Sequence, residues 1–321
     1  MPIFGPSVLA QLTLPLTLFI PPYKTPSQPP SEESIVNDLL DADFDILEES
    51  CSLIESLSLD VEDVRLSLAR GFDFPAEHGG VRCFSNILDF IERAGPHPMW
   101  TDVDRAQKEK SLAMCKAALI KSVVEVAGED HNEDVLWDES NPEMPGGEFV
   151  CRMVEWIKGY ISDMMARGGT GPGRDDLLIC ASLSLGNLAR RGALGASIQS
   201  IHINLQHTEK QASVLLSEPH SLATILSSQY LLSPETDIKV KHGVLGLLKH
   251  LAQACTKSLT LYEHLNRAGV VQAVCRCGIW DEKADAMSDI VQVGAIGIVK
   301  HMCNTHSKSA SLVLLWSSTE Q

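Results

Sequence analysis

Three side chains that can hydrogen-bond a polypeptide backbone recur at one position of a repeated sequence pattern: Asn187, His250 and His301. An amide offers donors and an acceptor, and a neutral imidazole offers one of each. A row of such side chains, called the ladder below, could therefore hydrogen-bond a partner's backbone. The same groups could instead satisfy hydrogen bonds within their own repeats. The predicted partner-binding set adds the neighbouring basic residues Arg190, Lys249 and Lys300 and, at the equivalent place in an earlier helix, Glu125.

The elements that must position this ladder are three apolar segments, at residues 177–191, 240–253 and 291–304. Each keeps small residues early, a branched apolar residue in the middle, and then Asn or His followed by an apolar and a small residue. The pattern returns after roughly fifty to sixty residues, with no strand-like alternation between the copies, which is typical of stacked helical repeats. The sequence therefore predicts an all-α chain built from repeats.

Composition limits what such a chain can bind. Aromatic residues make up 5% of the 321 residues and hydrophobic residues 44%, a balance that suits helix packed on helix. The formal net charge of −16 repels phosphate backbones and anionic lipid and attracts basic protein segments. We therefore expect no nucleic-acid partner.

Catalytic and metal-binding motifs are missing from the sequence. There is no nucleophile elbow, zinc-ligand spacing or Walker motif, and the glycine-rich segment 168–173 lacks the Gly-Lys-Ser/Thr that a phosphate loop needs. Cys275 and Cys277 would point about 200° apart on a helix, so they do not form a metal site. We predict a protein that is not an enzyme, with no catalytic residues, no metal and no cofactor.

The cellular compartment is predicted from the cysteines and the N-terminal apolar segment. Nine cysteines, an odd number without framework spacing, favour a reducing compartment, and we expect a cytoplasmic protein. The apolar segment 8–20 is too short to span a bilayer, so no stable membrane insertion is expected.

Composition shifts divide the chain into four regions. Residues 1–30, which end in a proline-rich stretch, are expected to be disordered. Residues 31–80 are expected to form an acidic helical region. Its acidic side chains either face solvent or form a binding surface for a basic tail. Residues 81–304 are expected to hold about four repeats, with one helix starting at Ser233-Pro234. Residues 305–321 end in an apolar run and read as a truncated end.

The repeated helix ends SLGNLA, LLKHLA and IVKHMC, with the RAGVVQAV segment before the last, resemble the armadillo repeat. That resemblance implies a right-handed helical solenoid whose third helices line a concave groove. Four residues before the three anchors stand Leu183, Gly246 and Gly297 instead of the tryptophan of nuclear import receptors.

Within armadillo proteins, KHGVLGLLKHLA and VQVGAIGIVKHMC resemble the GDP dissociation stimulators of small G proteins. This resemblance implies a guanine-nucleotide exchange function on small GTPases, including those with prenylated polybasic tails. Members of that family are longer than this chain. The alternative function is a non-catalytic armadillo adaptor that joins two proteins.

Overall fold

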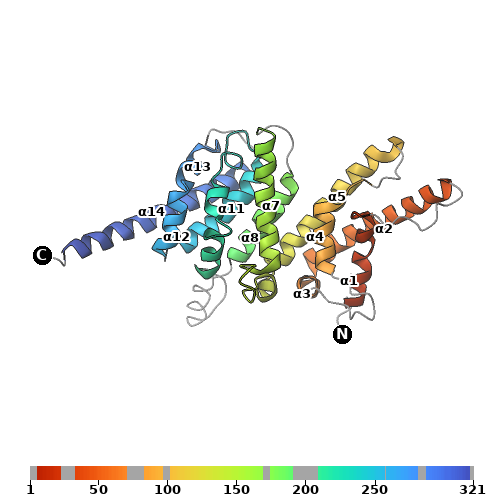
Figure 1. Ribbon diagram of the computed structural model, residues 1–321, viewed down its shortest axis with the longest axis horizontal. Helices are drawn as coiled ribbons and strands as arrows, with labels where there is room; N and C mark the ends of the chain where they lie inside the picture. Colours follow the sequence, from red (N-terminus) through yellow and green to blue (C-terminus); the bar gives the residue numbers. More distant parts are fainter. Residues whose placement is uncertain are drawn as a thin grey trace. The chain divides into compact units, whose positions relative to one another are not determined.

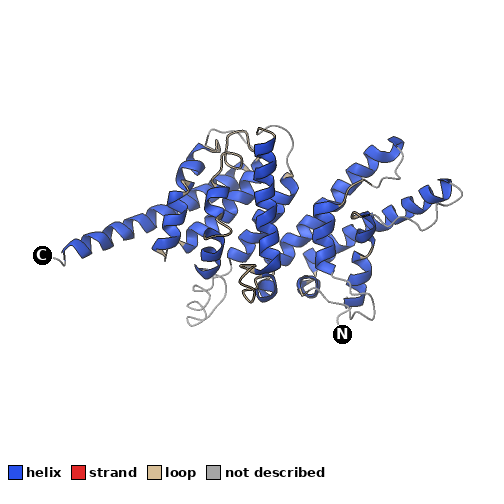
Figure 2. Cartoon of the chain, viewed as in Figure 1, coloured by secondary structure: helices blue, strands red, loops and turns tan. Residues whose placement is uncertain are grey.

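The computed structural model describes residues 6–22, 33–70, 83–96, 102–168, 174–190, 209–256, 258–280 and 287–318. Every regular element in these ranges is a helix, and none of them is a strand (Figures 1 and 2), so the all-α prediction is confirmed. None of the helices described combines the length and the apolar character needed to cross a bilayer. The chain divides into two compact units, residues 1–135 and 136–321, so the expected repeat region 81–304 extends over both.

Unit 1 is built around two long helices that pack along each other, α2 and α5. Its elements are α1 (Pro6–Thr13), η1 (Pro15–Phe19), α2 (Glu33–Asp60), α3 (Glu62–Ala69), α4 (Cys83–Arg93), α5 (Asp102–Gly128), η3 (Asp130–Asn132) and the start of α6 (Glu133–Leu136). One face of α5 is buried, and it consists of Leu112, Cys115, Leu119, Val123 and Val126. Spacings of three and four residues place these side chains on one side of the helix, which explains the burial.

Residues 6–22, expected to be disordered, are instead helical. Leu9, Leu16 and Phe19 are almost fully buried, and the Phe19 ring meets Phe44 of α2 edge-on at 5.9 Å between centroids. This apolar segment, too short for a membrane, packs against α2 and α4. The remaining residues of the 1–30 region, 1–5 and 23–30, lie outside the described residues.

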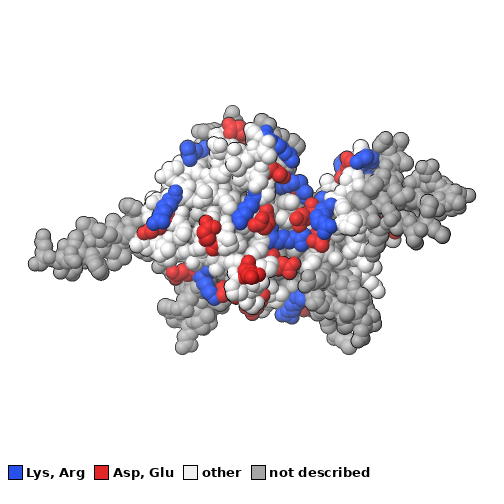
Figure 3. Space-filling model, viewed as in Figure 1, with Lys and Arg blue, Asp and Glu red and all other residues white. Residues whose placement is uncertain are grey.

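In the acidic region, residues 33–60 form α2 and residues 62–69 form α3, while residues 71–80 lie outside the described part of the chain. The inner face of α2 is apolar, with Leu47, Ile54 and Leu57 buried. On the face of the molecule shown in Figure 3, acidic and basic side chains alternate and do not gather into one acidic patch.

Unit 2 contains the three segments that carry the repeated pattern. Its helices are α7 (Gly147–Ala166), α8 (Asp175–Ala189), a segment at 209–216, α10 (Leu222–Leu226), α11 (Ile238–Ala254), α12 (Leu259–Arg267), α13 (Val270–Arg276) and α14 (Ser288–Ser318). Residues 177–189 of the first segment lie in α8, residues 240–253 lie in α11, and residues 291–304 lie in α14. The apolar run at 312–316 is part of α14.

The helix expected to start at Ser233-Pro234 begins later. Ser233 and Thr236 hydrogen-bond each other in a turn, and Asp237 caps α11 by accepting a 2.7 Å bond from the Lys239 backbone N–H. Both Ser233 and Asp237 are good N-cap types, so sequence alone favoured the one followed by proline.

Candidate functional site: a groove on three parallel helices

The helices α8, α11 and α14 lie side by side, with α11 packed between the other two (Figure 1). Gly243 of α11 faces Ile179 and Ser182 of α8, and further along Gly186 faces Leu247 and His250. Residue numbers rise together on the two facing helices, so α8 and α11 run parallel. The same holds for α11 and α14, where Leu245 faces Gly294 and Lys249 faces Gly297. Equivalent positions of the repeated pattern are therefore neighbours in space.

Glycines allow the close approach of these helices. A Cβ at Gly186 would lie 3.6 Å from the Leu247 Cα, and one at Gly243 would lie 3.3 Å from the Ser182 Cβ. At the other contact, a Cβ at Gly297 would lie 3.3 Å from the Cε of Lys249. Small residues at these three positions let the backbones or long side chains pack directly against the neighbouring helix.

A groove of about 530 Å³ opens over the three helices. Its floor belongs to α11, and its two sides belong to α8 and α14. It is lined by Ser182, Leu183, Gly186, Asn187, Arg190, His242, Gly243, Leu245, Gly246, Leu247, Lys249, His250, Asp289, Ile290, Val291, Val293 and Gly294.

Four of the seven predicted binding residues line this groove: Asn187, Arg190, Lys249 and His250. The remaining three do not. Lys300 is exposed and His301 half-buried on α14, beyond the groove lining, although His301 is near enough for its charge to act on His250. Glu125 lies half-buried on α5 of unit 1 and is not part of the groove.

His250 is held neutral by its surroundings. Burial, followed by the positive charges of Lys249, Arg190 and His301, lowers its pKa from 6.5 to about 4. Its Nδ1 atom is buried and has no hydrogen-bond partner among the described residues. Burial and the charges of Lys300 and Lys249 also lower the pKa of His301. Both imidazoles are thus mainly neutral at pH 7, so each offers one hydrogen-bond donor and one acceptor.

The end of the groove near Arg190 and Lys249 is basic. Within the described part of the chain, no carboxylate lies within ion-pair distance of Arg190, Lys249 or Lys300. The acidic lining residue, Asp289, lies near the start of α14, whereas Arg190 and Lys249 lie at or toward the carboxyl ends of α8 and α11, so in these parallel helices Asp289 is at the other end of the groove. This end of the groove contrasts with the acidic chain as a whole.

Neither the apolar sides nor the open floor of the groove was predicted from the sequence. Ile290 and Val293 on α14 are 57% and 61% exposed, which is unusual for such side chains. A Cβ at Gly246 would meet no atom within 4 Å, although Gly246 lies in the middle of α11. The small residues early in each repeat were the available signal, but their spacing does not say which glycine faces a helix and which faces the groove.

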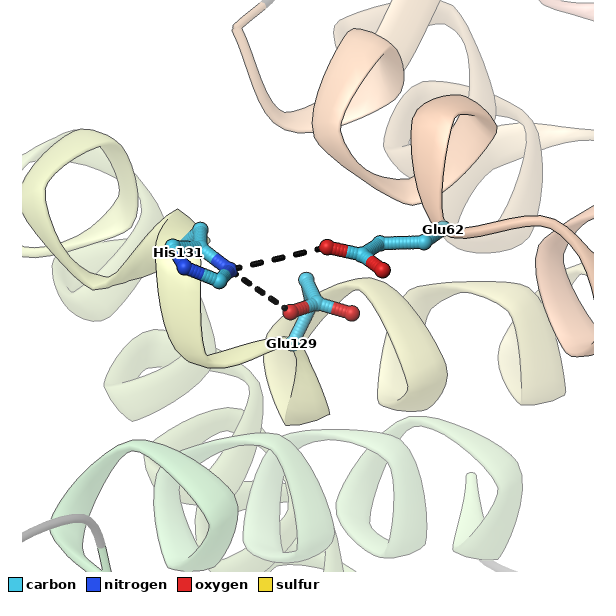
Figure 4. A group of neighbouring side chains, drawn as sticks. All are labelled: Glu62, Glu129 and His131. Carbon is cyan, nitrogen blue, oxygen red and sulfur yellow. Dashed lines mark hydrogen bonds and ion pairs between the residues drawn. The ribbon is translucent and has the colours of Figure 1, made fainter. Parts of the chain in front are cut away.

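Unit 1 holds a second polar cluster, formed by Glu62, Glu129 and His131 (Figure 4). His131 Nδ1 lies 3.7 Å from a Glu62 oxygen and 3.4 Å from a Glu129 oxygen. The three groups could chemically hold a divalent cation, but Arg65 Nε already donates a 3.0 Å hydrogen bond to Glu129. Burial raises the pKa of Glu129, and the hydrogen bonds from Arg65 and His131 more than offset this, so the net pKa is lowered. An ion-pair network that joins α3 to the end of α5 explains the cluster.

The same junction makes Asn132 a structural residue. It is fully buried, and its Nδ2 donates bonds of 3.0 Å to the Arg65 carbonyl and 2.9 Å to the Val126 carbonyl. Asn132→Ala should lower the free energy of unfolding of unit 1 by about 2 kcal/mol, because both hydrogen bonds donated by the buried Nδ2 are lost. Urea unfolding followed by circular dichroism measures this. Asn86→Ala, at a half-buried position on α4, is the control, and an equal loss in both variants would contradict the assigned role.

Comparison with known proteins adds no relative: no family model matches the chain, and no curated protein or solved structure shows significant similarity to it. The function must therefore be argued from the groove.

Proposed function

We propose that α8, α11 and α14 are the third helices of armadillo-type repeats in a right-handed solenoid, and that their groove binds a partner protein. The supporting observation is the parallel arrangement of these helices, which brings Asn187, Lys249 and His250 into one groove. The shared pattern of the three helices supports the repeat, since equivalent positions then stack on one another. None of these groups is arranged for covalent or acid–base chemistry, so the function is binding.

The proposed partner is a small GTPase, whose GDP release the chain stimulates. The support is the resemblance of the α11 and α14 segments to GDP dissociation stimulators. Such a protein needs no catalytic group, because a surface that prefers the nucleotide-free GTPase weakens GDP binding by that preference. A hundredfold preference corresponds to about 2.7 kcal/mol. Basic prenylated tails of such GTPases would meet the acidic chain outside the groove, and no nucleic acid would bind.

We place this activity in the cytoplasm. All nine cysteines are free thiols, and Cys51, Cys83 and Cys180 are among those that are buried. Free thiols in this number suit a reducing compartment.

The test is the release of fluorescent GDP from a panel of small GTPases, prenylated and unprenylated, with this chain in excess. We expect at least a tenfold faster release from one member and reversal of the complex by excess GDP, because GDP and the chain compete through the GTPase. A GTPase lacking its basic tail is the control for tail-dependent binding. Absence of acceleration across the panel would contradict the exchange function.

A non-catalytic adaptor is the second candidate, and the size of the groove favours it. A volume of about 530 Å³ accommodates a few side chains of an extended segment and not a folded domain. An adaptor would form stable complexes with GDP-bound and nucleotide-free GTPase alike. Equal affinity for the two states, measured by titration, would support the adaptor over the stimulator.

A further inference from the structure

We propose that the groove binds an acidic, extended segment of the partner, with an apolar side chain over Gly246 and a carboxylate at Arg190 and Lys249. The inference deepens the proposed function and rests on its claim that the groove is the partner-binding surface. It specifies the chemistry of what enters the groove, and it excludes a polybasic tail from that place.

The open space next to Gly246 is the first observation that supports the proposed apolar side chain of the bound segment. Glycine in the middle of a helix is less stable than alanine, so it needs a reason. At Gly186 and Gly243 the reason is the neighbouring helix, but at Gly246 no described atom lies within 4 Å of a Cβ position. The space above it is the groove itself. Leu183 on one side and Val293 on the other make this space apolar, which suits an aliphatic or aromatic side chain.

Two unpartnered polar atoms in the lining are the second argument. Ser182 is 0% exposed, and neither its Oγ nor the buried Nδ1 of His250 has a hydrogen-bond partner among the described residues. Buried polar groups in proteins are normally hydrogen-bonded. Ser182 packs against Gly243 of α11, but His250 is half-buried, so the backbone of a segment bound over its ring could supply the partner that Nδ1 lacks if the imidazole turns toward it. This observation is independent of the open floor at Gly246.

Charge decides what kind of segment fits. Arg190 and Lys249 line one end of the groove without a described carboxylate nearby, in a chain with 42 acidic and only 26 basic residues. Two unpaired cations in an acidic protein attract a carboxylate and repel a basic tail. The distance along α11 from Gly246 to Lys249 is about one helical turn, roughly 5 Å, so an apolar residue and an acidic neighbour could engage both.

The experiment selects random 12-residue peptides displayed on phage against the full chain. The enriched sequence is then synthesised with a fluorescent label, and its affinity is measured by anisotropy. Lys249→Glu reverses the proposed carboxylate contact, and Gly246→Leu fills the proposed apolar position. Lys239→Glu, on the same helix outside the lining, matches the charge change, and Gly159→Leu matches the glycine change at an exposed position of α7 where a Cβ meets no atom.

We expect enriched peptides with Asp or Glu beside an apolar residue. Their affinity should fall at least tenfold for Lys249→Glu and Gly246→Leu and stay within twofold for both controls. Higher salt should weaken binding to the wild-type chain. Enrichment of basic peptides, no enrichment at all, or equal affinity for Lys249→Glu and Lys239→Glu would overturn the proposal.

The same variants separate this inference from the GTPase proposal. If GDP release is accelerated and remains unchanged in Gly246→Leu and Lys249→Glu, the inference fails while the exchange function stands. If acidic peptides bind as expected and no GTPase responds, the inference stands and the exchange function fails.

Discussion

Lowering the pH from 7 to 4.5 should destabilise the wild-type chain by about 2 to 3 kcal/mol more than the His250→Gln variant. At pH 7 the imidazole of His250 is mainly neutral in both the folded and the unfolded state, so it contributes little to the pH dependence there. Below its ordinary pKa of 6.5 the unfolded chain takes up a proton. In the folded chain the pKa of His250 is about 4, so the folded state takes up this proton only when the pH falls to about 4.

The sign follows from this difference in proton binding. Because the unfolded state binds the proton first, acid favours unfolding between pH 6.5 and about 4, and the loss is complete below both values. Glutamine keeps a polar side chain of similar size and removes the titration. The variant should therefore lose less stability in acid, and below pH 5 it should be the more stable of the two.

Urea unfolding at pH 7 and pH 4.5, followed by tryptophan fluorescence, measures the effect. Trp137 and Trp156 are buried in the same unit as His250. His264→Gln, which changes a histidine of α12 outside the groove lining, is the control for a general loss of histidine. Parallel pH profiles for wild type and His250→Gln would show that the groove does not hold this imidazole neutral.

Gly186→Leu should lower the free energy of unfolding of unit 2 by about 3 kcal/mol, whereas Gly246→Leu should change it by less than about 1 kcal/mol. At Gly186 even a Cβ would lie 3.6 Å from the Leu247 Cα and 3.7 Å from its backbone nitrogen, so further atoms have no place between α8 and α11. At Gly246 the added side chain enters the open groove, and the gain in helix propensity offsets the exposed apolar surface.

Guanidinium unfolding at neutral pH compares the two variants with wild type. Gly159→Leu, at an exposed position of α7 with no atom near its Cβ, shows what the same substitution does on a free helix surface. Gly246→Leu should resemble this control. A loss at Gly246 as large as that at Gly186 would mean that the groove floor is not open.

The sequence alone determined the helical nature of the chain and the inner faces of its helices. Buried apolar residues of α5 and α7 recur at steps of three and four, because a helix buries one side and the local spacing specifies that side. The repeated pattern likewise identified α8, α11 and α14 and placed Asn187, His250 and His301 at equivalent points. The structure brings Asn187 and His250 into the groove, but not His301, Glu125 or Lys300.

Only the tertiary structure decided which of these residues lie close together. Gly186 and Gly246 look alike in sequence, yet one meets the backbone of a neighbouring helix and the other meets open space. The sequence predicted disorder for residues 6–22. In the structure this apolar segment packs against α2 and α4, which bury Leu16 and Phe19. Local spacing specifies which side of a helix is apolar, but contacts between residues far apart in the chain depend on how the helices pack. The groove, its basic end and the neutral His250 all arise from such contacts.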